Sequence, residues 1–307
     1  MDCFSKKELL DKLQQIIGDQ EILTEEPMEK HTTFRTGGKA SVFLKIQTTQ
    51  ALSGLLSFLT REELPYFILG NGSNLLVSDQ GYHGIIIRPG DQLYELKTEK
   101  TTIMASAGLP LAKIAHLAYE HSLTGMEFAS GIPGTLGGAL VMNAGAYDGE
   151  MKQITKEVYL MDRQGQSVTL DCEEMQFGYR SSILKSKPYI VLGAKLCLEE
   201  GNRDKIREKM DDFSARRYEK QPLDYPSAGS TFKRPEGMFA GRLIMDAGLR
   251  GASVGGAQVS KKHCGFIINK DHATSTDIYR LIGQVQKTVR ETSGVLLEPE
   301  VIFLGEF

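Results

Sequence analysis

The sequence contains no tryptophan, and its four cysteines, at positions 3, 172, 197 and 264, include no Cys-x-x-Cys pair. This pattern argues against a zinc site and a disulfide framework, so we expect no metal and a reducing, cytoplasmic location. No apolar run approaches the roughly 18 residues that a membrane helix needs. Residues 1–8 also lack the apolar core of a secretory signal. We therefore expect no membrane association.

A strong charge of either sign is also missing. The formal net charge is −3 and the pI is about 6.1, which leaves no electrostatic footprint for nucleic acid. A hydrophobic fraction of 41% and a charged fraction of 24% are ordinary for a soluble protein. A chain of 307 residues is long enough for a large core, and its length suggests about two domains.

Glycine is abundant, and it is concentrated in the stretch 129–150. Flexible linkers are polar, whereas this stretch carries apolar residues such as Ile132, Leu136 and Leu140 between its glycines. Glycine permits positive φ and close approach of a backbone or a ligand. The stretch therefore predicts a buried backbone around a flat or phosphorylated ligand, with a tightly packed structural turn as the alternative.

Hydrophobic periodicity predicts a strand-rich region before residue 200, without the regular alternation of a doubly wound parallel sheet. Glu157–Asp162 and Gln166–Leu170 flank a turn and indicate a hairpin. The other expected helices are 6–18, 49–59, 110–121 and a short one near 173–177, and the other expected strands are 41–46, 66–69 (short and buried), 75–77, 84–87, 92–97, 101–107 and 189–198.

The composition changes at 201–220, where mixed charges indicate a solvated surface helix. The segment Gln221-Pro-Leu-Asp-Tyr-Pro226 ends that helix and marks a candidate domain boundary. Thr274 and Asp277 have the spacing of a capping box at the start of a further helix. The elements expected in this part are helices at 239–247 and 275–292 and strands near 254–259, 264–269 and 300–305.

Three glycine loops are candidates for phosphate binding. Gly70-Asn-Gly-Ser-Asn74 follows a strand, but it lacks the third glycine and the following helix of a Rossmann fingerprint. Neither it nor the stretch 129–150 carries the Gly-Lys-Ser/Thr ending of a P-loop. The loop can still form an anion nest from successive N–H groups. Together, this loop, the stretch 129–150 and Arg35-Thr-Gly-Gly38 favour a dinucleotide site outside the Rossmann class. Each of the three alone is explained equally well as a simple turn.

The ordered motifs of the chain resemble those of the UDP-N-acetylenolpyruvoylglucosamine reductases, and the resemblance spans roughly residues 30–305. The matching stretches are Arg35-Thr-Gly-Gly38, Leu69-Gly-Asn-Gly-Ser-Asn-Leu-Leu-Val77, Gly131-Ile-Pro-Gly-Thr-Leu-Gly-Gly138, Asn143-Ala-Gly-Ala-Tyr147, Phe177-Gly-Tyr-Arg-Ser-Ser182, Ala228-Gly-Ser-Thr-Phe-Lys233, Ala240-Gly-Arg-Leu-Ile244 and Glu300-Val-Ile-Phe-Leu-Gly305. The chain is similar to the shorter class of the family, which lacks an extra tyrosine-bearing loop.

The resemblance implies an α+β protein with a two-lobed FAD-binding domain of the vanillyl-alcohol-oxidase (PCMH) type and a smaller α+β substrate-binding domain. We assign the FAD-binding region to 1–218, with sub-domains of roughly 1–68 and 69–218. The substrate-binding domain is 219–307. Its last strand either stays in that domain or packs back on the FAD region. The family binds FAD non-covalently, and we expect a monomer.

The resemblance also implies which residues contact FAD. They lie in the three glycine loops and in the stretch that follows the longest of them. They are Arg35, Thr36, Gly37, Gly70, Asn71, Gly72, Ser73, Asn74, Leu75, Gly131, Ile132, Pro133, Gly134, Gly137, Gly138, Asn143, Gly145 and Ala146.

The implied activity is NADPH-dependent reduction of UDP-N-acetylglucosamine enolpyruvate to UDP-N-acetylmuramate, a step of peptidoglycan precursor synthesis. In this reduction, negative charge develops on C2 of the enolpyruvyl group and on the carboxylate of that group. The site therefore needs a positioned cation and a proton donor. The resemblance implies that Arg180 holds the carboxylate, that Ser230 donates the proton and that Glu300 shares a proton or orients the substrate. Without the resemblance, the residue patterns indicate only a surface arginine at Arg180 and a turn residue at Ser230. They also do not decide between Glu298 and Glu300.

For the substrate, the resemblance implies contacts from Lys220, Arg234 and Tyr179, with Lys220 on the diphosphate. Arg234 stands where some members have asparagine. His263 is expected to be structural or to lie at the rim of the uridine site. The alternatives are another FAD oxidoreductase of the same fold, such as an oxidase, and a non-catalytic nucleotide-binding protein.

Overall fold

The structure of the chain is a computed structural model that describes residues 4–307, so the expectation for Cys3 lies outside the described residues. The chain forms two compact units, and neither is continuous in sequence. Of the described residues, the first comprises 4–24, 42–71 and 84–215, and the second comprises 25–41, 72–83 and 216–307. The assignment of 1–218 to FAD and 219–307 to substrate concerns what each region binds, and it stays a prediction.

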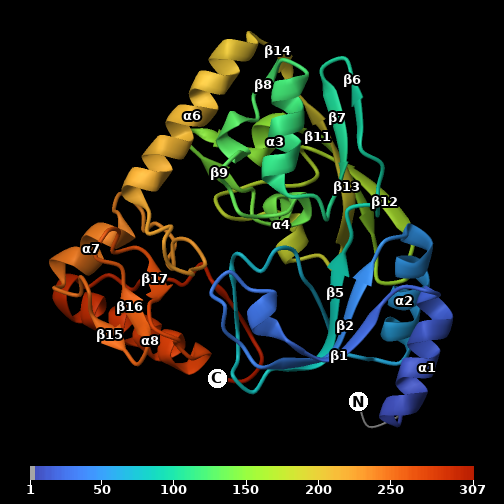
Figure 1. Cartoon of the computed structure of the whole chain (residues 1–307), viewed down its shortest axis with the longest axis horizontal. Helices are drawn as coiled ribbons and strands as arrows, with labels where there is room; N and C mark the ends of the chain where they lie inside the picture. The colour runs from blue at the N-terminus through green and yellow to red at the C-terminus, as the bar shows by residue number, and fades with distance from the viewer. Residues whose placement is uncertain (1–3) are drawn as a thin grey trace. The chain divides into compact units, whose positions relative to one another are not determined.

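The first unit begins with helix α1 (Lys6–Ile17), which packs beside α2 (Thr49–Arg61) (Figure 1). Their apolar faces are buried, as the periodicity predicts. A four-stranded sheet has the order β1 (Ile22–Pro27), β2 (Lys39–Ile46), β5 (Tyr82–Pro89) and β3 (Tyr66–Ile68). The prediction of a buried strand at 66–69 is wrong in one respect. Strand β3 is half-buried because it lies at the edge of this sheet.

A second sheet of the first unit is antiparallel and contains the predicted hairpin. Its order is β12 (Ser167–Asp171), β11 (Thr155–Met161), β13 (Ile190–Cys197), β7 (Thr102–Ser106) and β6 (Lys97–Glu99). The pairs Val158–Leu170 and Leu160–Val168 set the hairpin register. The strand expected at 92–97 is wrong apart from its last residue. Tyr94 instead stacks on Tyr159, with ring centroids 4.6 Å apart.

The short helix expected near 173–177 is also wrong, because these residues form turns. The carboxylate of Asp171 accepts hydrogen bonds from the N–H groups of Glu173 and Glu174, both at 2.9 Å. Such local side-chain bonds offer the backbone an alternative to a helix.

The remaining elements of this part of the chain are short, apart from two helices. They are α3 (Leu111–Glu120), β8 (Leu123–Thr124), η2 (Glu127–Ala129), α4 (Leu136–Val141), β9 (Gly145–Ala146), β10 (Gly149–Glu150), α5 (Met151–Ile154), η3 (Ile183–Lys185), β14 (Glu199–Glu200) and α6 (Arg203–Lys220). Helix α6 buries a single residue, Ile206, so it is the solvated surface helix that its composition predicts.

The second unit combines chain segments that are distant in sequence. Strand β4 (Leu75–Val77) pairs in parallel with β18 (Ile302–Leu304), and η1 (Met28–Lys30) precedes the Arg35–Gly38 loop. Helix α8 (Ser275–Ser293) packs on the sheet β15 (Ser253–Val254), β16 (Ala257–Val259) and β17 (Ile267–Asn269), and α7 (Ala240–Asp246) contacts α8 (Figure 1). Phe34 and Leu76 lie in the same core as Ile278, all almost fully buried.

Two expectations for this unit need correction. The strand near 254–259 is two strands, because Gly255, at φ +50°, begins a turn between β15 and β16. The last strand begins at Ile302, so Glu300 precedes it.

Among residues 4–307, no helix is both long and apolar enough to cross a membrane. The same residues contain no group of three or more histidine, cysteine or acidic side chains placed to hold a metal ion. Cys172, Cys197 and Cys264 are free thiols.

The N-terminus of α8 receives two caps. The predicted capping box is present, because the Thr274 hydroxyl accepts from the N–H of Asp277 at 3.0 Å and the Asp277 carboxylate accepts from the N–H of Thr274 at 3.0 Å. The Asp79 carboxylate accepts from the N–H groups of Ser275 and Thr276, both at 2.8 Å. The first helical N–H groups have no partner within the helix, so these bonds satisfy them.

We expect Asp79→Ala to lower the free energy of unfolding by about 1–2 kcal/mol, because it removes the acceptor of two otherwise unpaired N–H groups and a favourable charge at the helix N-terminus. Thermal unfolding followed by circular dichroism measures the effect. Gln80→Ala is the neighbouring exposed control and should leave the midpoint unchanged. An unchanged midpoint in Asp79→Ala would show that the cap contributes nothing.

Candidate functional site

Two of the predicted glycine loops meet within the first unit. Gly70 lies against Thr135, so that a Cβ added at Gly70 would sit 2.8 Å from the Thr135 hydroxyl. The side-chain amide of Asn71 donates to the carbonyl of Pro133 at 2.8 Å. These contacts join the start of the 70–75 loop to the glycine stretch, and they depend on the absence of a side chain at Gly70. Thr135, which was not predicted as a site residue, also caps α4 by accepting from the Gly138 N–H.

Arg180 is tied to the end of the same stretch. Its Nη2 donates to the carbonyl of Gly145 at 3.5 Å, and its guanidinium lies over the Tyr179 ring, 5.4 Å from the centroid. The buried Asn143 side chain donates to the carbonyl of Gly178 at 3.1 Å and accepts from the N–H of Lys152 at 2.9 Å. The turn that carries Arg180 is thereby held next to residues 143–145.

Three predicted site residues that are not glycine have left-handed backbones: Arg35 at φ +55°, Asn143 at φ +42° and Arg180 at φ +51°. Such conformations cost free energy for residues other than glycine and persist where the surroundings determine them. At Asn143 and Arg180 the hydrogen bonds just described supply that constraint. Strained backbone clusters at functional sites, but other residues of the chain, such as Glu63 and Ser122, share this conformation, so the choice of site residues stays a prediction.

The second unit holds the Arg35–Gly38 loop against residues 72–81. The N–H of Gly38 donates to the carbonyl of Ser78 at 2.8 Å, and the N–H of Thr33 donates to the carbonyl of Gly72 at 3.2 Å. Gly72 has φ +59°, and a Cβ there would overlap the carbonyl oxygen of His31. Gly72 is therefore required by the fold of this unit itself.

Two of the predicted catalytic residues are also brought together in this unit. The N–H of Glu300 donates to the carbonyl of Thr231 at 2.8 Å, which places the Ser230–Thr231 turn beside Glu300. The side-chain amide of Asn74 donates to the carbonyl of Glu300 at 3.0 Å. The main chain of Glu300 is thus linked to Thr231, the neighbour of Ser230, and to the side-chain amide of Asn74. The Ser230 side chain is exposed. Arg180 belongs to the first unit.

Glu298 differs from Glu300 in its surroundings. The Lys233 ammonium donates to the Glu298 carboxylate, and the N–H of Lys233 donates to the carbonyl of Glu298 at 2.9 Å. The Glu298 side chain is 68% exposed, whereas Glu300 is half-buried. Glu298 is therefore engaged in a surface ion pair.

The predicted substrate residues lie on exposed surface. Lys220 is the last residue of α6, and Tyr179 is 59% exposed. The guanidinium of Arg234 lies 4.5 Å from the ring centroid of Phe239, which is itself 61% exposed. This cation–π pair lies on the exposed surface of the second unit.

His263 is half-buried. Burial lowers its pKa, because the charged form is desolvated, and its Nδ1 accepts from the N–H of Gly265 at 3.1 Å. Its ring packs edge-on against Phe266, with the centroids 5.0 Å apart. These contacts support the structural interpretation of this residue.

A cavity of about 500 Å³ lies within the second unit. Three predicted FAD contacts, Arg35, Thr36 and Gly37, form part of its wall. Gly38 of the same glycine loop also lines it, although it was not predicted as a contact. The remaining lining residues were not predicted, because they come from parts of the chain without a glycine motif: Glu29, Asp79, Tyr225, Pro226, Asn269, Lys270, Asp271, His272, Ala273 and Thr274. The cavity carries charges of both signs.

Comparison with known proteins identifies relatives of both parts of the chain. Residues 40–171 match the family model "FAD binding domain", and residues 221–304 match "UDP-N-acetylenolpyruvoylglucosamine reductase, C-terminal domain". The UDP-N-acetylenolpyruvoylglucosamine reductase of Caldanaerobacter subterraneus subsp. tengcongensis is 51% identical over 97% of this chain and 98% of its own length.

Solved structures give the same result. The crystal structure of the Thermus caldophilus UDP-N-acetylenolpyruvylglucosamine reductase has a TM-score of 0.79 and 34% identity, and the match covers 93% of this chain and 99% of that one. The glucose dehydrogenase Phl p 4.0202 is similar in fold alone, with a TM-score of 0.50 and 12% identity over 64% of this chain and 44% of that one. The predicted α+β fold with an FAD-binding domain of the PCMH type is confirmed.

At one position of the glycine stretch, the fold alone gives no reason for glycine. Gly138 is exposed in helix α4 without a positive φ, and a Cβ there would meet nothing closer than the Thr135 hydroxyl, at 3.6 Å. Alanine is the better helix former, so a glycine here fits a ligand that approaches the backbone closely.

We expect Gly138→Ala to weaken FAD binding while it leaves the apo-protein as stable or more stable, by up to about 1 kcal/mol. The matched control is Gly283→Ala, an exposed glycine in α8 with no atom within 4 Å of its added Cβ. It should stabilise the protein without changing FAD affinity. Fluorescence titration with FAD and thermal unfolding of the apo-proteins measure both effects. Equal FAD affinities in the two variants would remove Gly138 from the cofactor site.

Proposed function

Because the chain belongs to the UDP-N-acetylenolpyruvoylglucosamine reductase family, we propose that it reduces UDP-N-acetylglucosamine enolpyruvate to UDP-N-acetylmuramate with NADPH. The chain is an FAD-dependent oxidoreductase, and the family acts in peptidoglycan precursor synthesis. FAD, when bound, supplies the carrier that takes a hydride from NADPH and passes it to the enolpyruvyl group. The observation that carries the proposal is the pair of hydrogen bonds that join the main chain of Glu300 to the Thr231 carbonyl, next to Ser230, and to the Asn74 side-chain amide.

Arg180 is the proposed ligand of the substrate carboxylate. A guanidinium holds a carboxylate through two parallel hydrogen bonds, and it keeps its charge throughout the reaction. The contacts of Arg180 with Gly145 and with the Tyr179 ring orient it in the turn that follows Phe177. The positive charge offsets the negative charge that develops on the carboxylate and C2 in the transition state.

Ser230 and Glu300 are the proposed proton-handling residues. The Ser230 hydroxyl delivers a proton to C2, a role that a weak acid fills only against a very basic carbanion in a fixed, dry geometry. Gly229, at φ +74° and with no atom within 4 Å of an added Cβ, leaves space next to this hydroxyl. Glu300, held beside the Ser230 turn by the Thr231 carbonyl, orients the substrate or shares the proton.

The FAD contacts proposed are those of the three glycine loops and residues 143–146, and the substrate contacts are Lys220, Arg234 and Tyr179. We further propose that the enzyme acts as a monomer in the cytoplasm. An oxidase of the same fold is the second candidate. It would reoxidise rapidly in air without any sugar nucleotide, whereas the proposed reductase consumes NADPH only when the enolpyruvyl substrate is present. One assay of NADPH consumption with and without that substrate separates the two.

We expect Ser230→Ala to bleach the flavin with NADPH at the normal rate but to reoxidise with the enolpyruvyl substrate roughly 10²–10⁴ times more slowly, because a positioned proton donor is lost. Stopped-flow absorbance at the flavin band measures each half-reaction separately. Normal reoxidation in this variant would exclude Ser230 from the mechanism.

We expect Glu300→Gln to slow the same half-reaction, while Glu298→Gln leaves it unchanged. The two carboxylates are two residues apart, but Glu298 already pairs with Lys233 at the surface. Single-turnover kinetics of both variants tests the assignment. A slow step in Glu298→Gln with a normal one in Glu300→Gln would reverse the roles of the two residues.

A further inference from the structure

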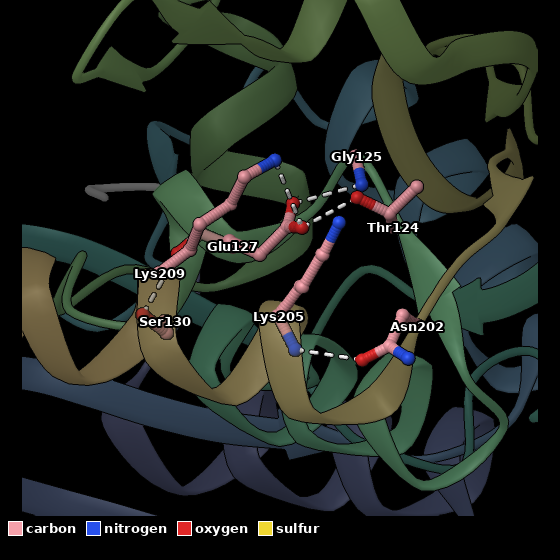
Figure 2. A network of polar contacts seen from close by, with 7 residues as sticks. All are labelled: Thr124, Gly125, Glu127, Ser130, Asn202, Lys205 and Lys209. Carbon is pink, nitrogen blue, oxygen red and sulfur yellow. Dashed lines mark hydrogen bonds and ion pairs between the residues drawn. The ribbon is translucent and has the colours of Figure 1, made fainter.

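A buried carboxylate lies immediately before the glycine stretch. The Glu127 side chain is only 7% exposed, and it accepts hydrogen bonds from the Thr124 hydroxyl at 2.5 Å and the Gly125 N–H at 2.8 Å (Figure 2). Lys209 places its ammonium 3.7 Å from the same carboxylate. Burial opposes ionisation, yet these hydrogen bonds and the lysine charge hold the pKa of Glu127 below its ordinary value. Glu127 is therefore a satisfied, ionised carboxylate.

The backbone of Glu127 continues this anchoring forward along the chain. Its carbonyl accepts from the Ser130 N–H at 3.2 Å and from the Ser130 hydroxyl at 2.8 Å. The carbonyl of Ala129 then accepts from the N–H of Ile132 at 3.1 Å. The carboxylate thus holds the preceding turn while the carbonyl holds the following one. The direction in which the chain enters Gly131 depends on both.

The next residue reaches the far end of the same stretch. Phe128 is buried, and its ring fills the space next to Gly149, where an added Cβ would lie 2.5 Å from the ring. Helix η2, which contains Glu127 and Phe128, contacts both β9 and β10. One anchored turn therefore constrains the beginning and the end of residues 131–149.

Helix α6 completes the arrangement. Strand β14 pairs with β8 and leads to Asn202, whose side chain accepts from the N–H groups of Asp204 and Lys205 at the start of α6. Lys205 and Lys209 both point from α6 toward the Glu127 carboxylate (Figure 2). Further along, the Tyr147 hydroxyl donates to the carbonyl of Phe213 at 3.0 Å, and the two rings stack 4.4 Å apart. Since α6 buries only Ile206, these contacts are a large part of what holds it.

We propose that Glu127 is a positioning residue for FAD, which it does not touch: its carboxylate holds residues 131–146 in the conformation that binds the cofactor. The proposal rests on the proposed placement of FAD on that stretch. A loop that is ordered before binding loses little further conformational entropy when the ligand binds, so pre-organisation raises the affinity. Without the anchored turn, part of the binding free energy is spent on ordering the stretch.

The test is Glu127→Gln, which keeps the size of the side chain but places an amide N–H₂ among donors, so that one of the N–H or O–H groups now facing the carboxylate loses its acceptor. We expect the dissociation constant for FAD to rise about tenfold or more. We also expect an altered visible circular dichroism of the bound flavin and a smaller difference between the holo and apo unfolding temperatures. Glu208→Gln, at an exposed position of α6, is the matched control and should change none of these.

A second variant covers the case in which Glu127→Gln does not fold. Thr124→Val removes one hydrogen-bond donor to the carboxylate and keeps the side-chain shape, so it should raise the dissociation constant in the same direction but less. If the variants lower the apo and holo unfolding temperatures equally, with unchanged FAD affinity and flavin dichroism, Glu127 is only structural and the proposal is overturned. If Gly138→Ala weakens FAD binding in that case, the proposed cofactor site stands. If Gly138→Ala also has no effect, the site itself is misplaced.

Discussion

Close approach at positions that carry no side chain, Gly70 in the first unit and Gly72 in the second, is the constraint on which the glycine loops depend. In the first unit, Gly70 lies directly against Thr135, and Asn71 donates to the Pro133 carbonyl. In the second, Gly72 lies against the carbonyl of His31. Any side chain at these two glycines would separate the paired loops. The loops therefore present N–H groups and small polar side chains, which suits a phosphorylated ligand better than an apolar one.

The segments that carry the proposed catalytic residues are held by hydrogen bonds to main-chain carbonyls. Thr231 and Glu300 are joined N–H to carbonyl, and Asn74 donates to the Glu300 carbonyl. None of these bonds uses the Ser230 hydroxyl or the Glu300 carboxylate. Arg180 follows the same principle, because the turn that carries it is held by Asn143 through the carbonyl of Gly178. Hydrogen bonds of this kind fix the segments from which the proposed catalytic groups project, as a functional site requires.

Acidic side chains stabilise the starts of helices and turns at several places, and two of them lie close to the predicted binding loops. Asp79 caps α8 from a segment that is distant in sequence, and Glu127 closes the turn before the glycine stretch. Both satisfy backbone N–H groups that would otherwise lack partners. Glu298, by contrast, is exposed and pairs with Lys233, where solvent screening keeps the contribution of an ion pair small. The burial and partners of each acid, and not its charge alone, decide its role.

Local patterns in the sequence determined the longer helices, the hairpin at 155–171 and the capping box of α8, because periodicity, turn residues and caps act over a few residues. The same patterns, read together as ordered motifs, identified the family. Only the tertiary structure decided that β3 is a half-buried edge strand, that Tyr94 stacks on Tyr159 instead of joining a strand, and that Phe34 and Leu76 enter the core of the second unit. It alone also decided that Glu127 is buried beside Gly125 and Lys209. Contacts between distant segments depend on how helices, strands and loops pack within each unit. No short window of sequence contains that information.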